Sequence, residues 1–160
     1  MKKIFGLGLI LIAIDQLSKL IVANTIPVNQ TVTIIKDFFY LTNLKNTGAA
    51  WSILEGRSAF LVILGIAAII FIISLIKDEK NLNTIHIISY GLLLGGIAGN
   101  LIDRIYLGGV IDFIYIELFN FPIFNISDMC IVCGVIIFTF ETIRSDLYGK
   151  TNRNKKLKNR

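Results

Sequence analysis

Two aspartates set among apolar residues are the side chains in this sequence most able to do chemistry. Asp112 lies between Ile111 and Phe113, and Asp128 follows sixteen residues later, next to Met129. An ionised carboxylate at membrane depth is costly, so such residues usually mark a pathway or a catalytic site. Two carboxylates brought close together share one proton, as in aspartic proteases, and can then act as general base and general acid. The pair therefore predicts an intramembrane aspartyl protease.

The composition is that of a membrane protein. Of the 160 residues, 54% are hydrophobic and 17% are charged, and this length predicts a single domain over 1–160. The net charge of +5 comes from a basic tail, 150–160, which holds six basic residues and no acidic one. A basic tail after an apolar segment is typical of a cytoplasmic anchor at anionic headgroups. We therefore expect membrane lipids as partners and no nucleic acid.

Four stretches are apolar over about 20 residues, the length that crosses a bilayer. They are 4–24, 57–76, 84–104 and 125–144. The first begins like a secretory signal peptide, with Lys2 and Lys3 before an apolar run. Asp15 interrupts this run, however, and no small-x-small cleavage site follows it, so we expect a retained helix. The sequence thus predicts an all-α membrane protein with four transmembrane helices.

Basic residues set the expected orientation. Most of them fall on one side of a four-pass arrangement, which the positive-inside rule places in the cytoplasm together with both termini. They are Lys2, Lys3, Lys77, Lys80, Arg144 and the residues of the tail. Two connections, 25–56 and 105–124, then lie outside.

The longer outer connection carries strand-like sequence. Residues 31–34 and 38–42 are rich in β-branched and aromatic types, and Gly48 breaks the pattern after them. A sheet satisfies its own backbone polar groups, which lipid cannot do. We therefore expect a small extracytoplasmic β-cradle with aromatic residues at the membrane interface. These aromatic residues are Phe38, Phe39, Tyr40 and Trp51.

Further polar residues converge on the outer leaflet. Asn100 and Arg104 are four positions apart and so share a face at the outer end of the third helix. Asp15 lies about 17 Å along the first helix, Asn46 lies in the outer connection, and Asp128 falls in the first turn of the fourth helix. The active site is therefore expected toward the outer leaflet.

Five short motifs contain these residues in order. They are Asp15-Gln16-x-Ser18-Lys19, Asn46-x-Gly48-Ala49-Ala50-Trp51, Gly95-Gly96-x-x-Gly99-Asn100-x-x-Asp103-Arg104, Val110-x-Asp112-Phe113 and Phe124-Asn125-x-x-Asp128. Together they resemble the lipoprotein signal peptidases, the type II signal peptidases of bacterial membranes, which form aspartyl peptidase family A8. The resemblance extends from Asp15 to about Glu141. It implies four transmembrane helices with an outer β-cradle and a catalytic dyad at Asp112 and Asp128.

The remaining roles follow from the positions of these residues together with the resemblance. Asp103 is expected to hold local structure, by pairing with a basic residue. Small departures from the family pattern are Ser127 and Trp51. The implied substrate is a diacylglyceryl-modified prolipoprotein, cut just before the modified cysteine, and neither a metal nor an organic cofactor is needed. We expect a monomer in the bacterial cytoplasmic membrane. The residues expected to bind substrate are Asp15, Asn46, Asn100, Arg104 and Asn125.

Simpler interpretations of single residues remain open. Asp112 alone is compatible with a solvated loop carboxylate, and Asp128 alone with an acid favoured by a helix N-terminus. Asn125, three residues before Asp128, could cap the fourth helix. Arg104 could anchor a helix end by snorkelling, and Lys19 is expected to do so.

Metal, redox and Ser-His chemistry fit the sequence less well. Cys130 and Cys133 lack a second cysteine pair to complete a zinc site, and within a helix we expect them to act as small hydrophobic residues. His86 is the single histidine and lies near the cytoplasmic start of the third helix, far from the outer cluster. This position argues against a Ser-His protease and against a histidine-rich metal site.

A proton or ion transporter with four helices is the alternative from a different functional class. Asp15, Asp103 and Arg104 would then form a relay. A relay distributes acids through both leaflets, whereas the acids of this sequence gather in the outer one. A cleavage assay on a lipidated pre-lipoprotein in detergent separates the two functions.

Reporter fusions test the orientation. A reporter after Arg160 or near Lys77 should report the cytoplasm, and one near Gln30 should report the outside, because basic residues flank the first two positions. Two reporters, one active only outside and one only in the cytoplasm, control for each other at every site. An outside C-terminus would contradict the convergence of polar residues on the outer leaflet.

Overall fold

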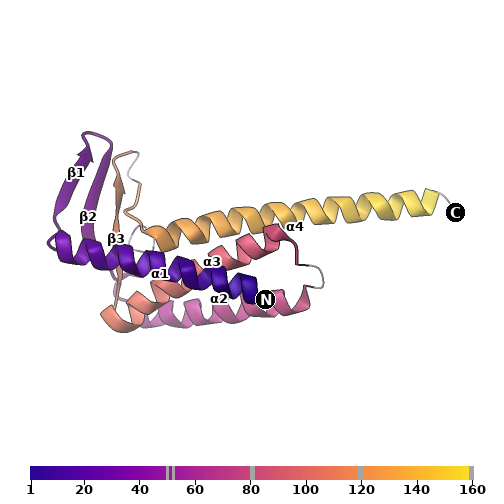
Figure 1. The fold of residues 1–160 in the computed structure, drawn as a ribbon, viewed down its shortest axis with the longest axis horizontal. Helices are drawn as coiled ribbons and strands as arrows, with labels where there is room; N and C mark the ends of the chain where they lie inside the picture. Colours follow the sequence, from indigo (N-terminus) through magenta and orange to yellow (C-terminus); the bar gives the residue numbers. More distant parts are fainter. Residues whose placement is uncertain (50, 52, 80–81, 119–120, 159–160) are drawn as a thin grey trace.

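The computed structural model describes residues 1–49, 51, 53–79, 82–118 and 121–158. Within them, four helices and three strands follow in the order α1, β1, β2, α2, α3, β3, α4. The helices are Lys2–Thr25 (α1), Ser58–Asp78 (α2), Thr84–Leu107 (α3) and Ile126–Lys158 (α4). Each contains a stretch long and apolar enough to cross a membrane. In Figure 1 the sheet stands at one end of the helices, and both termini lie toward the other end.

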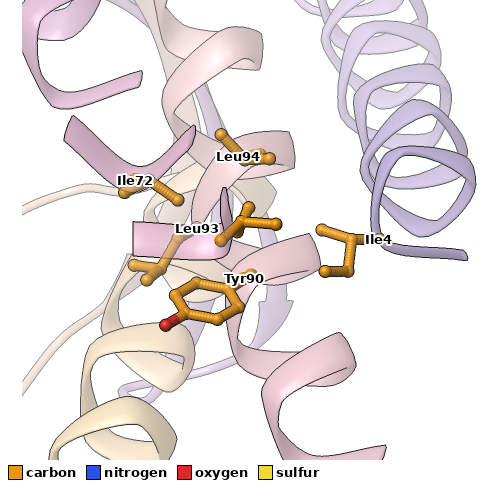
Figure 2. Close-up of a cluster of buried hydrophobic side chains, with 6 residues drawn as sticks. Ile4, Ile72, Tyr90, Leu93 and Leu94 are labelled. Atoms are coloured by element: carbon orange, nitrogen blue, oxygen red, sulfur yellow. The ribbon is translucent and has the colours of Figure 1, made fainter. Parts of the chain in front are cut away.

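Helix α3 is the centre of the bundle, because it contacts each of the other three helices. At the end away from the sheet, Ile4 of α1, Ile72 of α2 and the α3 residues Tyr90 and Leu93 form a buried apolar cluster (Figure 2). The outward faces of the helices carry many exposed large apolar side chains, as expected of surfaces that face lipid. Four buried glycines let neighbouring helices approach α3 closely. They are Gly91, Gly95, Gly96 and Gly99.

The sheet consists of β1 (Thr31–Ile35), β2 (Phe39–Asn46) and β3 (Val110–Ile116), paired antiparallel in that order. Strands β1 and β2 come from the longer outer connection, where the sequence predicts strands. Strand β3 comes from the shorter connection, in which no strand was predicted, although Val110–Ile116 is rich in β-branched and aromatic residues. The predicted fold class, an all-α membrane protein with a small β element, is confirmed.

Two connections fix β3 against the helices. Gly108 ends α3 in a left-handed conformation, with φ of 71°, which glycine adopts without steric cost, and the chain then turns into β3. On its other side, β3 binds the residue that precedes α4 by two positions. The Ile114 N–H donates to the Phe124 carbonyl (2.8 Å), and the Phe124 N–H donates back to Ile114 (3.1 Å). The start of α4 therefore lies beside β3.

Helix α4 is longer than the helix predicted at 125–144, whereas the other three lie within about three residues of their predicted ends. It continues to Lys158, so the predicted basic tail is helical over most of its length. No proline follows Pro122 in the sequence, so no residue lacks the N–H that continues a helix. The part of α4 apolar enough to cross a membrane ends at Ser145.

Gly99 lies where α3 packs against α1 and the start of α4. A Cβ at this position would lie 2.7 Å from Asp15 Oδ2 and would collide with Ser127 Oγ. Gly99→Ala should therefore lower the free energy of unfolding by about 1–3 kcal/mol, the usual cost of overpacking, and lower the Tm in detergent. Gly6→Ala is the matched control, because a Cβ at Gly6 meets nothing within 4 Å. It should leave the Tm unchanged or raise it, and equal losses in both variants would contradict the close packing at Gly99.

Candidate active site

Asp112 and Asp128 come from different elements but share one neighbour. Asp112 is the third residue of β3, and Asp128 lies in the first turn of α4. Asn125 donates from Nδ2 to Asp112 Oδ1 (2.7 Å) and from its backbone N–H to Asp128 Oδ2 (3.1 Å). Its Oδ1 accepts from the Asp128 N–H (3.0 Å), so Asn125 also caps α4. One asparagine thus holds both carboxylates.

Two further amides bind the carboxylate oxygens of this pair that Asn125 does not bind. Asn46 is the last residue of β2 and donates from Nδ2 to Asp112 Oδ2 (2.9 Å). Asn100 of α3 donates from Nδ2 to Asp128 Oδ1 (2.7 Å). Each carboxylate therefore accepts one N–H on each oxygen, which fixes its rotamer. An ionised carboxylate has about four lone-pair sites, so capacity to bind water or substrate is left on both.

Burial makes the ionisation of Asp112 unusual, since only 2% of this residue is exposed. Desolvation raises the pKa of Asp112 from 3.8 to about 6, and the negative charge of Asp128 acts in the same direction. Hydrogen bonds from Asn46 and Asn125 and the positive charge of Lys19 lower this pKa and oppose the effect of burial. A carboxyl whose pKa lies near the working pH can give or take a proton during a reaction.

The two carboxylates lie in the wall of a cavity of about 420 Å³. Segment 121–124 and the α4 residues Met129 and Val132 contribute to a wall that is otherwise largely apolar. A mainly apolar cavity with a few converging polar groups is typical of a ligand-binding site. The other polar residues of the wall are Asn46, Asn100 and Arg104.

Comparison with known proteins identifies the family. The family of signal peptidase (SPase) II matches residues 7–144 of this chain. Two solved structures of bacterial membrane enzymes, both determined by the in meso method, are similar to it. One is 30% identical with a TM-score of 0.85, and the match covers 91% of this chain and 90% of the other. The second is 31% identical with a TM-score of 0.80, covering 89% and 93%.

The chain belongs to the signal peptidase II family. It is therefore an aspartic peptidase that acts on the signal peptides of lipoproteins, as the sequence motifs imply.

A buried ion cluster lies beside the pair Asp112 and Asp128. The Lys19 ammonium lies 2.8 Å from Asp15 Oδ2 and 2.9 Å from Asp103 Oδ2, and it donates to Asn100 Oδ1 at 3.0 Å. Asp103 Oδ2 also accepts from the Ile111 N–H (3.1 Å) and so ties α3 to β3. Lys19 is only 2% exposed, so the expectation that it snorkels is wrong. Two carboxylates meet its charge inside the protein, and the ammonium does not have to reach water.

The residues predicted to bind substrate separate into two groups. Asp15 and Asn125 do not line the cavity. Asp15 is 1% exposed, and its Oδ1 accepts from the Ser127 N–H at the start of α4 (2.9 Å). Asn125 is fully buried, and both side chains are bonded to protein groups, so their positions do not support contact with a substrate. Those that line the cavity are Asn46, Asn100 and Arg104.

Arg104 connects α3 to the longer outer loop. Its Nη2 donates to the Gly48 carbonyl (3.0 Å), and its Nη1 donates to the backbone carbonyl of Asn100 (3.3 Å). Its Nε is buried and has no hydrogen-bond partner among the residues that the structure describes. An unpaired buried N–H is unfavourable, so this group is suited to receive an acceptor from a bound molecule.

Sequence analysis missed the roles of Lys19 and Gln16. Gln16 donates through Nε2 to Asp103 Oδ1 (2.8 Å) and to the Gly99 carbonyl (3.2 Å), which joins α1 to α3. A signal for Lys19 was present. It follows Asp15 by four positions, which places both charges on one face of a helix inside an apolar span. Opposite charges on one intramembrane face pair with each other.

The cysteines and the histidine have no part in this cluster. Cys130 and Cys133 are both free; Cys130 is buried, and Cys133 lines the cavity. His86 and Asn83 form a capping box at the start of α3. In the described part of the chain, no group of three or more His, Cys, Asp or Glu side chains could hold a metal ion.

Asn46→Ala tests the hydrogen bonding of Asp112. It removes a donor that lowers the pKa of Asp112, so this pKa should rise further. Because kcat/KM reports the pKa values of the free enzyme, one limb of its pH profile should move to higher pH by about 0.5–1 unit, the equivalent of one hydrogen bond. The measurement uses purified protein and a lipidated prolipoprotein.

Asn43→Ala is the control for this variant. Asn43 is buried in the same strand, but its Nδ2 donates to the Ile26 carbonyl (2.7 Å) and not to Asp112 or Asp128. Asn43→Ala should leave both limbs of the pH profile of kcat/KM in place. A shift to lower pH in Asn46→Ala would contradict the hydrogen bond to Asp112.

Proposed function

We propose that Asp112 and Asp128 hydrolyse the peptide bond of a diacylglyceryl-modified prolipoprotein just before its modified cysteine. The observation that carries this proposal is the binding of both carboxylates to Asn125 in the wall of one cavity. Like charges held by one residue favour a shared proton, which is the state that an aspartic peptidase needs.

The reaction uses one water molecule and one shared proton. The ionised aspartate takes a proton from water as the water oxygen bonds to the carbonyl carbon. The protonated aspartate donates to the carbonyl oxygen, which becomes a hydroxyl. When the C–N bond breaks, the aspartate that received the water proton gives it to the leaving amine, and the hydroxyl proton returns to its partner. The products are a carboxylic acid and a free amine, and the pair recovers its starting protonation.

Arg104 and the apolar wall position the substrate. A peptide cut in the membrane must leave its helix at the scissile bond, so its freed carbonyls need donors. The buried Nε of Arg104 lacks a partner among the described residues and is a donor of this kind. The apolar residues of the cavity wall accept the side chains and lipid that precede and follow the bond. Asp15 and Asn125 act on the substrate through other protein groups and not by contact.

The peptidase works as a monomer in the bacterial cytoplasmic membrane, with both termini in the cytoplasm. The basic residues Lys2, Lys3 and Lys77 lie at helix ends on the side away from the sheet, which supports this orientation. The sheet and the catalytic pair then lie toward the outer leaflet, where the lipid-modified cysteine of a translocated precursor resides. Membrane lipids contact the exposed apolar faces of the helices.

The transporter alternative receives less support. Its relay would use Asp15, Asp103 and Arg104, but Asp15 and Asp103 are both paired with Lys19 in one buried cluster. A relay needs groups that exchange protons along a path, whereas these ions hold α1, α3 and the start of α4 together.

Asp112→Asn and Asp128→Asn test the catalytic pair. Each keeps the shape of the side chain and removes the titratable group, so each should lower kcat at least about a thousandfold. The assay follows cleavage of a lipidated prolipoprotein by purified protein, with the Tm measured in parallel. Asp37→Asn is the matched control, because Asp37 is exposed at the turn between β1 and β2; it should cleave at the normal rate. Cleavage by either dyad variant at a near-normal rate would exclude the aspartyl mechanism.

A further inference from the structure

Two hydrogen bonds lead from Lys19 to Asp128 through one amide. The Lys19 ammonium donates to Asn100 Oδ1 (3.0 Å), and Asn100 Nδ2 donates to Asp128 Oδ1 (2.7 Å). Asn125 Nδ2 also donates to Asn100 Oδ1 (3.2 Å). The oxygen end of this amide thus faces two donors, and its nitrogen end faces a carboxylate.

Lys19 permits only this orientation of Asn100. An ammonium has three N–H donors and no acceptor, and Lys19 meets three acceptors, on Asp15, Asp103 and Asn100. A reversed Asn100 amide would place its NH2 group against the ammonium and its oxygen against the carboxylate of Asp128. Both contacts would be repulsive, so the cation determines which end of the amide reaches Asp128.

The same contact strengthens the donor. A positive charge at the oxygen of an amide draws electrons away from its NH2 group, and in a site that excludes water this polarisation is little screened. The donors of Asp112 lack such a charge. Asn46 Oδ1 accepts from the neutral Gly48 N–H (2.9 Å), and Asn125 Oδ1 accepts from the backbone N–H of Asp128. The two carboxylates of the pair are therefore not equivalent.

Charged groups from every element packed against Asp128 take part in its electrostatics. Lys19 and Arg104 favour its negative charge, and Asp15 and Asp112 oppose it. Asp15 and Asp103 weaken the field of Lys19, but they also hold the ammonium in place against Asn100. The acidic groups are Asp15 on α1, Asp103 on α3 and Asp112 on β3.

We infer that Lys19 is a positioning residue that keeps Asp128, through the amide of Asn100, as the ionised member of the pair. Asp128 is then the general base, which takes the proton of the water as its oxygen bonds to the carbonyl carbon. Asp112 is the general acid, which donates its proton to the carbonyl oxygen. This assignment rests on the proposed function and divides its two catalytic roles between the two residues.

The pH profile of kcat/KM separates the two roles. With Asp128 as the base, the acid limb reports protonation of Asp128, and the alkaline limb reports loss of the proton of Asp112. Lys19→Met and Asn100→Leu should each move the acid limb to higher pH by about 1 unit and lower kcat about tenfold with little change in KM. Because the charge of Lys19 also lowers the pKa of Asp112, Lys19→Met should move the alkaline limb to higher pH by a smaller amount. Lys19→Arg keeps the charge and should restore the acid limb toward its normal position. Asn46→Ala should mainly move the alkaline limb instead. A shift mainly of the alkaline limb in Asn100→Leu, or mainly of the acid limb in Asn46→Ala, would overturn the assignment.

A double variant tests whether Lys19 acts through Asn100. If it does, Lys19→Met combined with Asn100→Leu should move the acid limb by less than the sum of the two single shifts, because both changes remove one shared interaction. Fully additive shifts would mean that Lys19 acts on Asp128 only through space, and would overturn the role of the amide. Lys36→Met and Asn43→Ala control for loss of a lysine charge and of a buried amide elsewhere; Lys36 is exposed, and Asn43 bonds to Ile26.

Asp103→Asn gives a second test that keeps the buried cation. Lys19→Met leaves two buried carboxylates without their counter-ion, and it is set aside if it does not purify as folded protein. Asp103→Asn removes a counter-charge and retains Lys19, so the acid limb should move to lower pH, and this shift should become smaller when Asn100→Leu is also present. A shift that keeps its full size in the presence of Asn100→Leu, or that has the opposite sign, overturns the inference.

Failure of the inference can be told apart from failure of the proposed function. If Asp112→Asn and Asp128→Asn are inactive while the acid limb ignores Lys19 and Asn100, the proposed function stands and the inference is wrong. If either dyad variant cleaves normally, both are wrong.

Discussion

A lysine that cannot reach water needs opposite charge within contact distance, because an unpaired buried ion costs more than most other defects in a folded protein. Lys19 meets this need with two carboxylates, and each of them has a second bond. Asp15 accepts from the Ser127 N–H at the start of α4, and Asp103 accepts from the Ile111 N–H in β3. The charge on one side chain of α1 therefore connects α3, β3 and α4 near the proposed catalytic pair.

This arrangement explains how two acids, one in a strand and one in a helix, become a pair. A strand and a helix present side chains in different directions, and only fixed ends bring Asp112 of β3 toward Asp128 of α4. The bonds between Ile114 and Phe124 hold the chain that enters α4 against the strand. Gly99 lets α3 lie close enough for Asn100 to reach Asp128. Backbone contacts set the approach of the pair, and amide side chains then fix its orientation.

The parts of this fold that depend on local pattern could be predicted from the sequence. Apolar runs of membrane length indicate the four helices, and acids within apolar sequence indicate Asp112 and Asp128, which we propose to be catalytic. Strand β3 was missed although Val110–Ile116 is rich in β-branched and aromatic residues, because its pairing with β2 depends on residues far away in the sequence. Lys19 was misjudged for a similar reason. Whether a lysine snorkels or pairs depends on Asp103, which lies in another helix.

The substrate-binding roles predicted for Asp15 and Asn125 stay predictions, but the structure favours supporting roles for both residues. Motifs mark residues that a site needs, but they do not separate groups that touch the substrate from groups that hold the site. Burial does separate them: Asp15 and Asn125 are 1% and 0% exposed, and their partners are protein atoms. A site that works beside lipid cannot rely on water to orient its polar groups, so protein amides and ions must do so before substrate arrives.

The charges of the site also explain why one proton must stay on the pair. With one aspartate of the pair protonated, three carboxylates remain: Asp15, Asp103 and the other aspartate of the pair. The two basic groups Lys19 and Arg104 balance two of these three charges. The uncompensated charge is that of the base that acts on the water. Loss of the one proton on the pair would leave two uncompensated charges in a buried place, which burial and the repulsion of like charges both oppose. The pKa of Asp112, raised to about 6 by desolvation and further supported by the charge of Asp128, reflects this resistance. A substrate that fills the apolar cavity removes more water and so makes loss of this proton still less favourable. The acid therefore stays protonated while the scissile bond is in place.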